Sequence, residues 1–160
     1  MAKKSDAELL RATALGQELT DDERTVLVTK MKKRELKDGE LLVNEGEPVT
    51  TLFVLIEGRL SVSSRIEGNE VTVYAMSPGE CAGTRAFVDR TPRKATLRAE
   101  GKTVVMTLEP DAFESLLADH PRIVYNVMRA IFRITHSNLM RMNQETQQLT
   151  NYIQKTHGRY

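Results

Sequence analysis

The residues of this chain that could do chemistry lie mainly between Pro78 and Thr96, in the segment PGECAGTRAFVDRTPRKAT. This segment combines a Gly-containing turn, a short helix and a basic run between two expected strands. The first turn of a helix presents unpaired backbone N–H groups and a partial positive charge, which attract an anion. Arg93 can add a planar fork that binds two oxygens of one phosphate. The segment therefore predicts an anion-binding site.

Arg93 also has an interpretation without a ligand, because an Arg at the start of a strand can pair with a surface carboxylate such as Asp89. An exposed pair of this kind contributes only about 0 to 1 kcal/mol. Arg85 and Lys94 are open to two similar interpretations, either as extra positive charge at the site or as solvated surface groups. The sequence alone leaves these alternatives open.

Other reactive residue types are not arranged for catalysis or metal binding. The single cysteine, Cys81, is expected to be a small core residue, and the three histidines lie far apart without the spacing of metal ligands. No His lies near a Ser or Cys nucleophile in the sequence, and there is no Gly-rich loop for a nucleoside triphosphate. We therefore expect a protein that is not an enzyme and that has no cofactor.

Length and composition favour one domain with a helical extension. The chain has 160 residues and a net charge of +1, and its charges form no block that would indicate nucleic-acid or membrane binding. The N-terminus lacks the apolar stretch of a secretory signal, and no window approaches the length of a membrane span. We expect a cytoplasmic protein without a membrane partner.

The elements that must position the anion-binding segment follow from capping patterns and hydrophobic periodicity. Two capping boxes, at residues 5–8 and 20–23, each predict a short helix that packs on a larger body. From Leu36 the sequence changes to short β-type runs, separated by turn signals about 8 to 12 residues apart. This spacing is typical of an antiparallel barrel or sandwich. The turn signals include Glu57-Gly58 and Glu100-Gly101.

Two further helices are expected near the C-terminus. The first begins at Glu109-Pro110, with Pro at the N1 position, and ends at His120, with Leu116 and Leu117 on its buried side. The second begins at Pro121 and meets no Gly or Pro before Gly158, which allows one helix about 50 Å long. Steps of three and four along it give a coiled-coil-like seam of Tyr125, Met128, Phe132, Thr135, Leu139, Met142, Thr146, Leu149 and Ile153.

A second apolar stripe lies beside this seam in the first half of the helix only and is expected to face the β structure. The seam predicts a homodimer joined along residues 121–156. The alternative is a helix that folds back on its own domain and ends in a frayed tail, because residues 143–148 are polar. The second stripe consists of Val124, Val127, Ile131 and Ile134.

The segment 78–96 resembles the phosphate-binding cassette of cyclic nucleotide-binding domains, and residues 38–58 resemble the opening strands of the same family. This resemblance implies a mainly β protein with α-helices, an antiparallel β-roll (a jelly-roll-like barrel) flanked by N-terminal helices and a long C-terminal helix. The expected segments are a helical part at 1–35, the β-roll at 36–109 and C-terminal helices at 110–160. The matching cassette residues are Gly83, Ala86, Pro92, Arg93, Ala95 and Thr96.

The resemblance also implies a binding site for a cyclic nucleotide. It places the cyclic phosphate against Gly83, Ala86, Arg93 and Ala95, with Arg85 and Lys94 as additional positive charges. Thr84 stands where the family carries a Glu that accepts hydrogen bonds from the ribose 2′-hydroxyl, and Glu80 belongs to the strand entry instead. Asn138 lies near the position that contacts the base, although a polar residue beside a coiled-coil seam can also serve register.

These residues predict a dimeric sensor or adaptor that binds cAMP, cGMP or another phosphorylated ligand weakly and signals through its long helix to an unknown protein partner. One alternative is a ligand-free structural interaction module. Another is a truncated transcription regulator that contacts DNA through basic residues of the long helix. We expect no nucleic-acid partner, because the regulators in this family carry a winged helix-turn-helix after the long helix and the sequence ends at Tyr160.

Overall fold

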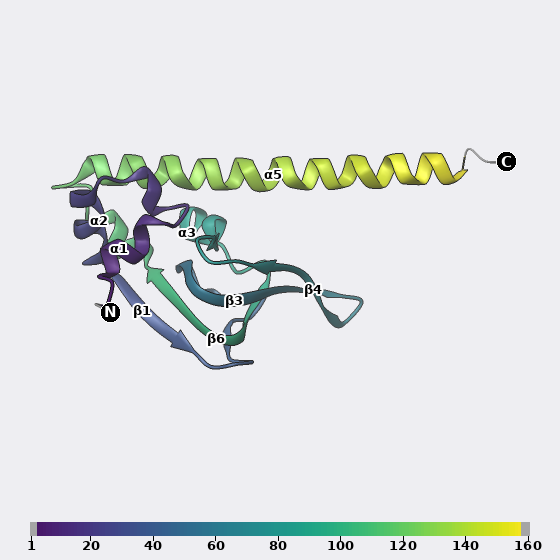
Figure 1. The fold of residues 1–160 in the computed structure, drawn as a ribbon, viewed down its shortest axis with the longest axis horizontal. Helices are drawn as coiled ribbons and strands as arrows, with labels where there is room; N and C mark the ends of the chain where they lie inside the picture. Colours follow the sequence, from purple (N-terminus) through teal and green to yellow (C-terminus); the bar gives the residue numbers. More distant parts are fainter. Residues whose placement is uncertain (1–2, 158–160) are drawn as a thin grey trace.

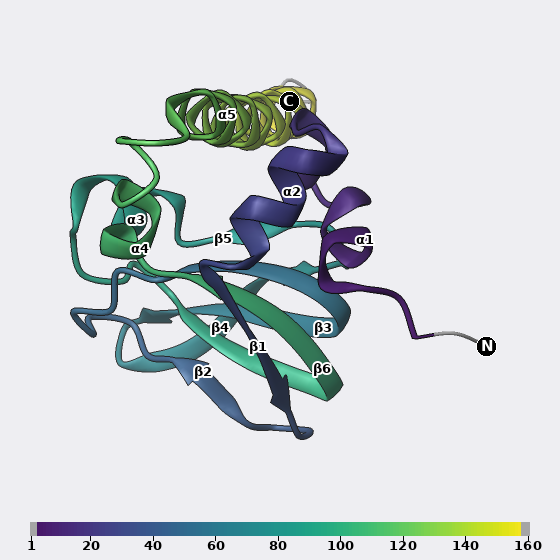
Figure 2. The same ribbon diagram turned by 90° about the vertical axis from the view of Figure 1, so that its left-hand side faces the viewer.

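The computed structural model describes residues 3–157; the outermost residues of the expected segments 1–35 and 110–160, namely 1–2 and 158–160, lie outside the described residues. A strongly curved sheet lies below a single long helix, and the N-terminal helices fill one end of the space between them (Figures 1 and 2). The helices are α1 (Asp6–Arg11), the 3-10 helix η1 (Gly16–Glu18), α2 (Asp21–Val28), α3 (Thr84–Asp89), α4 (Pro110–Glu114) and α5 (Pro121–His157). The strands are β1 (Met31–Leu36), β2 (Leu41–Val43), β3 (Leu52–Ile66), β4 (Asn69–Met76), β5 (Cys81–Ala82) and β6 (Thr96–Leu108).

The sheet is antiparallel and has six strands in the order β1-β6-β3-β4, with β2 on β6 and β5 on β3. It confirms the expected β-roll with N-terminal helices and a long C-terminal helix, although the sheet stays open and does not close into a barrel. Alternate residues of β3 face two different cores, as the two-residue period of a strand requires. Leu52 and Val54 face the helices, whereas Phe53 and Leu55 face the inside of the roll.

The two longest strands correct the expected turns at Glu57-Gly58 and Glu100-Gly101. β3 runs through Gly58 and β6 runs through Gly101, so each is one strand where the sequence predicted two. The pairing of β3 with β6 shifts register on both sides of Glu57, which marks a bulge. Gly58 has a φ of 85°, and a Cβ there would lie 2.4 Å from the Lys102 backbone oxygen. Gly58 therefore lets β3 bend where it comes close to β6.

The N-terminal segment packs as predicted, with two local differences. The Ser5 capping box is complete, since Ser5 and Glu8 each bond the backbone of the other. Thr20 caps α2, but the carboxylate of Glu23 accepts from Asn126 Nδ2 of α5 (2.9 Å) and does not return to its own cap. β1 begins at Met31, before the expected start of the β structure at Leu36. The leucines of this segment that reach the core beneath α5 are Leu10, Leu15, Leu19 and Leu27.

The helix expected after Glu109 is shorter than predicted. It starts with Pro110 as expected but ends at Glu114 and not at His120. Leu116 is buried, whereas Leu117 is exposed, which corrects the expectation that both face the core.

Helix α5 has 37 residues, a length of about 55 Å. Its first half covers the roll through Ile123, Val127 and Ile131, and Val124 packs against the same core. Its second half extends beyond the sheet (Figure 1). The second stripe predicted from the sequence therefore does face the β structure, while most large apolar residues of the seam remain exposed.

Replacing Gly58 by Ala is expected to lower the free energy of unfolding by about 2 to 5 kcal/mol, because a left-handed backbone and a displaced Lys102 carbonyl both cost energy. Gly68 is the matched control, since it has a similar φ of 81° but no atom within 4 Å of the added Cβ. Gly68→Ala is expected to cost about 1 to 2 kcal/mol. Urea denaturation measures the free energy of unfolding of both variants. An equal decrease in the two would contradict the close approach of the Lys102 carbonyl at Gly58.

Candidate functional site

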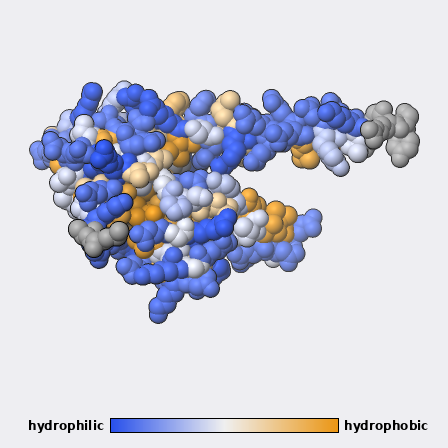
Figure 3. Space-filling model, in the orientation of Figure 1, coloured by the Kyte–Doolittle hydropathy of each residue, from blue (hydrophilic) through white to orange (hydrophobic). Residues whose placement is uncertain are grey.

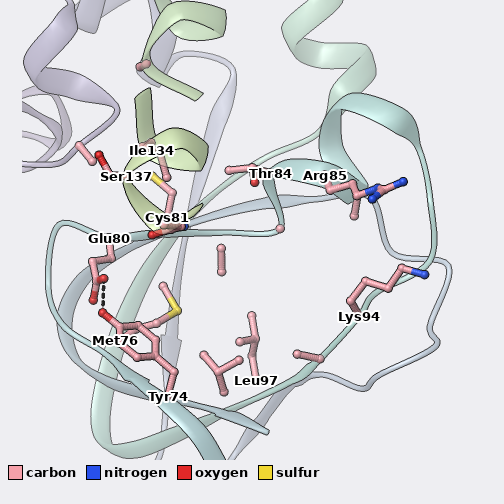
Figure 4. Close-up of a pocket in the computed structure, with 18 of the residues that line it drawn as sticks. Tyr74, Met76, Glu80, Cys81, Thr84, Arg85, Lys94, Leu97, Ile134 and Ser137 are labelled. Atoms are coloured by element: carbon pink, nitrogen blue, oxygen red, sulfur yellow. Dashed lines mark hydrogen bonds between the residues drawn. The ribbon is translucent and has the colours of Figure 1, made fainter. Parts of the chain in front are cut away.

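A cavity of about 680 Å³ lies between the roll, the segment 82–95 and the first half of α5. Its walls come from distant parts of the chain, including Gln17 and Glu18 near η1, Tyr74 on β4 and Arg141 on α5. Figure 4 shows side chains from these elements around an open centre. The volume is within the usual range for a small-molecule site.

The structure brings all of the predicted site residues to this one cavity. Gly83 is the N-cap of α3, Ala86 is buried in its first turn, and Arg93 is buried at the entry to β6. Asn138 reaches the cavity from α5 and is half-buried, so it lies beside the exposed seam and not in it. The predicted residues that line the cavity are Gly83, Thr84, Arg85, Ala86, Arg93, Lys94, Ala95 and Asn138.

Gly83 lets the Arg93 guanidinium lie directly against the backbone. Its φ is 83°, and a Cβ at this position would lie 2.1 Å from Arg93 Nη1. No side chain caps α3, which begins at the next residue. Backbone N–H groups and a guanidinium therefore lie side by side at the wall of the cavity, which is the arrangement that favours an anion.

Arg93 is 5% exposed, and its Nη1 donates to the backbone oxygen of Thr51 (2.8 Å). Its guanidinium lies 5.0 Å from the centre of the Phe53 ring. No carboxylate pairs with it among residues 3–157, and burial lowers the pKa of the guanidinium from its usual value. The alternative of a surface pair with Asp89 does not form, because Asp89 pairs with Arg85 over 3.5 Å. A buried guanidinium without a counter-charge is costly, so a ligand anion at this position would be stabilising.

Arg85 and Lys94 line the rim of the cavity and are both exposed. Figure 4 shows their two charged ends on the same side of the cavity. Thr84, the first residue of α3, lies beside Arg85 at the edge of the cavity and offers a neutral hydroxyl.

The sequence did not indicate the polar group at the opposite side of the cavity. Glu80 was assigned to the strand entry, yet its carboxylate lines the cavity, where Oε1 accepts from Tyr74 Oη (2.5 Å) and Oε2 from the Ser77 N–H (2.6 Å). The hydrogen bond to Glu80 raises the pKa of Tyr74 above its usual value. The guanidinium of Arg141 lies 4.3 Å from the centre of the Tyr74 ring. The spacing of Asn138 and Arg141, one helical turn apart on α5, was the available signal for Arg141.

Cys81 lines the cavity, and its side chain is a protonated thiol and not a nucleophilic thiolate. Burial raises its pKa to about 12, so the group is protonated at neutral pH. Among residues 3–157, no three His, Cys, Asp or Glu side chains come together as a metal site would require. Within the same residues, no helix has the length and apolar character needed to cross a bilayer.

Comparison with known protein families identifies the family of this chain. The sequence model of the cyclic nucleotide-binding domain matches residues 33–120, which is more than half of the chain. The chain belongs to the cyclic nucleotide-binding domain family. The anion cradle of Gly83 and Arg93 lies within the matched region.

Two relatives of this cyclic nucleotide-binding domain protein align with different shares of the chain. It is 30% identical over 115 residues to a cAMP-dependent protein kinase regulatory subunit of Mycosarcoma maydis, covering 69% of this chain and 22% of the relative. It is 24% identical over 136 residues to a CRP-like cAMP-activated global transcriptional regulator of Mycobacterium tuberculosis, covering 82% of this chain and 61% of the relative. The chain thus spans less than two thirds of either protein.

The fold has a close counterpart among solved structures. A cyclic nucleotide-binding domain from Methylobacillus flagellatus superposes with a TM-score of 0.78 at 21% sequence identity, covering 87% of this chain and 79% of that one. At this identity the likeness shows the fold.

Removing the Arg93 charge is expected to change the free energy of unfolding by less than about 1 kcal/mol in Arg93→Met, because relief from burying an unpaired charge offsets the lost Thr51 bond. Arg24 is the matched control, since it is 6% exposed but bonds Asp21 and the backbone oxygens of Gly16 and Leu19. Arg24→Met is expected to cost about 1 to 3 kcal/mol. Denaturant titration measures both, and an equally large loss at Arg93 would show that its role is structural.

Proposed function

We propose that this protein is a non-catalytic regulatory domain that binds a cyclic nucleotide, with the cyclic phosphate held by Arg93 and the turn at Gly83. The observation that carries the proposal is the buried Arg93 guanidinium, which has no carboxylate partner among the described residues and lies against a helix start on the cavity wall. A phosphate would supply the missing counter-charge. The relatives named for cAMP dependence or cAMP activation support the same ligand class.

Thr84 sets the strength of this binding. The family carries a Glu here, and an ionised carboxylate accepts a ribose hydroxyl with about 1.5 to 3 kcal/mol, against about 1 kcal/mol for a neutral Thr hydroxyl. The difference of about 0.5 to 2 kcal/mol means that a cyclic nucleotide should bind about 2- to 30-fold more weakly than to a site with the Glu.

Helix α5 is the element through which binding would be communicated. It supplies one wall of the cavity and is tied to the N-terminal segment by an ion pair between Arg133 and Glu18, which also line the cavity. A ligand that contacts α5 would favour one position of this helix over others, and the extended second half would pass the change to a partner.

Isothermal titration calorimetry with cAMP and cGMP tests the proposal. Both nucleotides are expected to compete for one site, and Arg93→Met is expected to weaken binding by about 10- to 100-fold, because charge-assisted hydrogen bonds to the phosphate are lost. Arg59→Met is the matched control, since Arg59 is exposed, pairs with Glu100 and lies outside the cavity. Absence of binding up to millimolar nucleotide in folded protein would favour the ligand-free interaction module instead.

We also propose that two copies associate along the seam of α5. Phe132 is 70% exposed, Leu139 54% and Leu149 60%, and these side chains share the face that the 3-4 spacing predicted. Two helices with such a face can bury it against each other as a coiled coil. The second half of α5 projects beyond the sheet (Figures 1 and 3), which supports this association over the alternative of a helix folded back on its own domain.

The double substitution Phe132→Glu and Leu139→Glu is expected to give monomers, because it places charges in the paired face. Light scattering coupled to gel filtration at high micromolar concentration measures the mass. Gln148→Glu is the control with the charge outside the seam and should leave the mass unchanged. A wild-type protein that is already monomeric under these conditions would contradict the seam assignment.

A further inference from the structure

The cavity has a second polar end, opposite the phosphate cradle. Figure 4 shows the bonded pair Glu80 and Tyr74 on one side of the cavity and Arg85 and Lys94 on the other. We propose that Glu80 and Arg141 read the base of the bound nucleotide at this end and that they select guanine over adenine. The inference rests on the proposed function, since it takes the phosphate to lie against Arg93.

The distance between the two ends suits a base and not a ribose. Glu80 and Gly83 are joined by strand β5, which is extended, so their backbones lie roughly 10 Å apart. The 2′-hydroxyl lies close to the cyclic phosphate, whereas the base is the far end of the nucleotide. The group that reaches Glu80 is therefore the base.

Glu80 presents acceptors only. An ionised carboxylate has about four lone-pair sites, and the Tyr74 hydroxyl and the Ser77 N–H use two of them. The remaining sites on the cavity wall need a donor from the ligand. Guanine offers N1–H and its exocyclic amine as adjacent donors, whereas the same edge of adenine presents the unprotonated N1 beside a single amine. A carboxylate thus pairs twice with guanine and meets a lone pair on adenine.

Arg141 presents donors only. Its guanidinium lies over the Tyr74 ring, and no carboxylate pairs with it among the described residues, so N–H groups remain for the ligand. Guanine O6 and N7 are acceptors that an Arg fork binds, whereas adenine carries an amine in place of O6. The donor and the acceptor at this end therefore match two adjacent edges of the same base, the edge with O6 and N7 and the edge with N1–H and the amine.

The other charged pair of the cavity does not compete for this role. Glu18 and Arg133 form an ion pair with each other, so their charges are already satisfied. Within residues 3–157, the hydrogen-bond partners of the Glu80 carboxylate are the neutral Tyr74 hydroxyl and the Ser77 N–H. Arg141 lies against Tyr74, whose pKa its charge lowers in opposition to Glu80, and it forms no ion pair with a carboxylate among these residues.

Calorimetric titration of the full chain with cGMP, cAMP and cIMP tests the inference. We expect cGMP to bind at least about 10-fold more tightly than cAMP, because one well-made bidentate pair discriminates between bases by that order. We expect cIMP, which keeps O6 and N1–H but lacks the amine, to lie between them.

Glu80→Gln is expected to bring the affinities for cGMP and cAMP within about threefold of each other, since the amide keeps an acceptor for Tyr74 but loses the charge and one acceptor for guanine. Arg141→Met is a second variant that should reduce the preference through O6 and N7. Glu70→Gln, on strand β4 with Tyr74 but outside the cavity, is the matched control and should keep the wild-type ratio.

A cAMP affinity equal to or above that for cGMP, or an unchanged ratio in folded Glu80→Gln and Arg141→Met, would overturn this inference and leave the proposed function standing. Binding of none of the three nucleotides would overturn both. Because the measured quantity is a ratio between two ligands, a general loss of affinity in a variant does not imitate the predicted result.

Discussion

The burial of the Arg93 guanidinium is the interaction on which the arrangement of the cavity depends. Glycine at position 83 is required because the guanidinium occupies the space of a side chain there, and the Thr51 carbonyl and the Phe53 ring fix its orientation. Nothing on the protein neutralises the charge within the described residues. The fold therefore holds a desolvated cation at a cavity wall. This arrangement costs free energy that a bound anion would offset.

Helix α5 turns this local site into a property of the whole chain. Its first half is buried on the core through Val127 and Ile131 and also forms a wall of the cavity, so the packing that stabilises the helix also places it at the cavity. Its second half carries exposed apolar residues such as Leu139 and Leu149 beyond the sheet. One helix thus carries both a wall of the cavity and an exposed apolar face.

The cavity is asymmetric in its chemistry. One end has the Arg93 cation and the start of α3 with the neutral hydroxyl of Thr84, and the other end has the carboxylate of Glu80 and the guanidinium of Arg141, which both contact Tyr74. Affinity that the family gains from a Glu at the ribose must come from elsewhere if the ligand is to bind well. The two charged groups at the far end are placed to provide it, because charge-assisted hydrogen bonds are the strong ones.

Local patterns in the sequence were enough to predict the β-roll, the capped N-terminal helices, the long helix with its two apolar stripes and the cradle of Gly83 and Arg93. Each of these depends on periodicity, caps or a contiguous motif. The sequence did not show that Gly58 and Gly101 lie within strands, because a bend and a turn use the same residue and only the facing strand distinguishes them. Nor could it show that Glu80, Tyr74 and Arg141 meet, or that Arg93 lacks a carboxylate. Tyr74 and Glu80 meet across the turn that follows β4, and Arg141 reaches Tyr74 from α5, so only the tertiary packing decided these contacts.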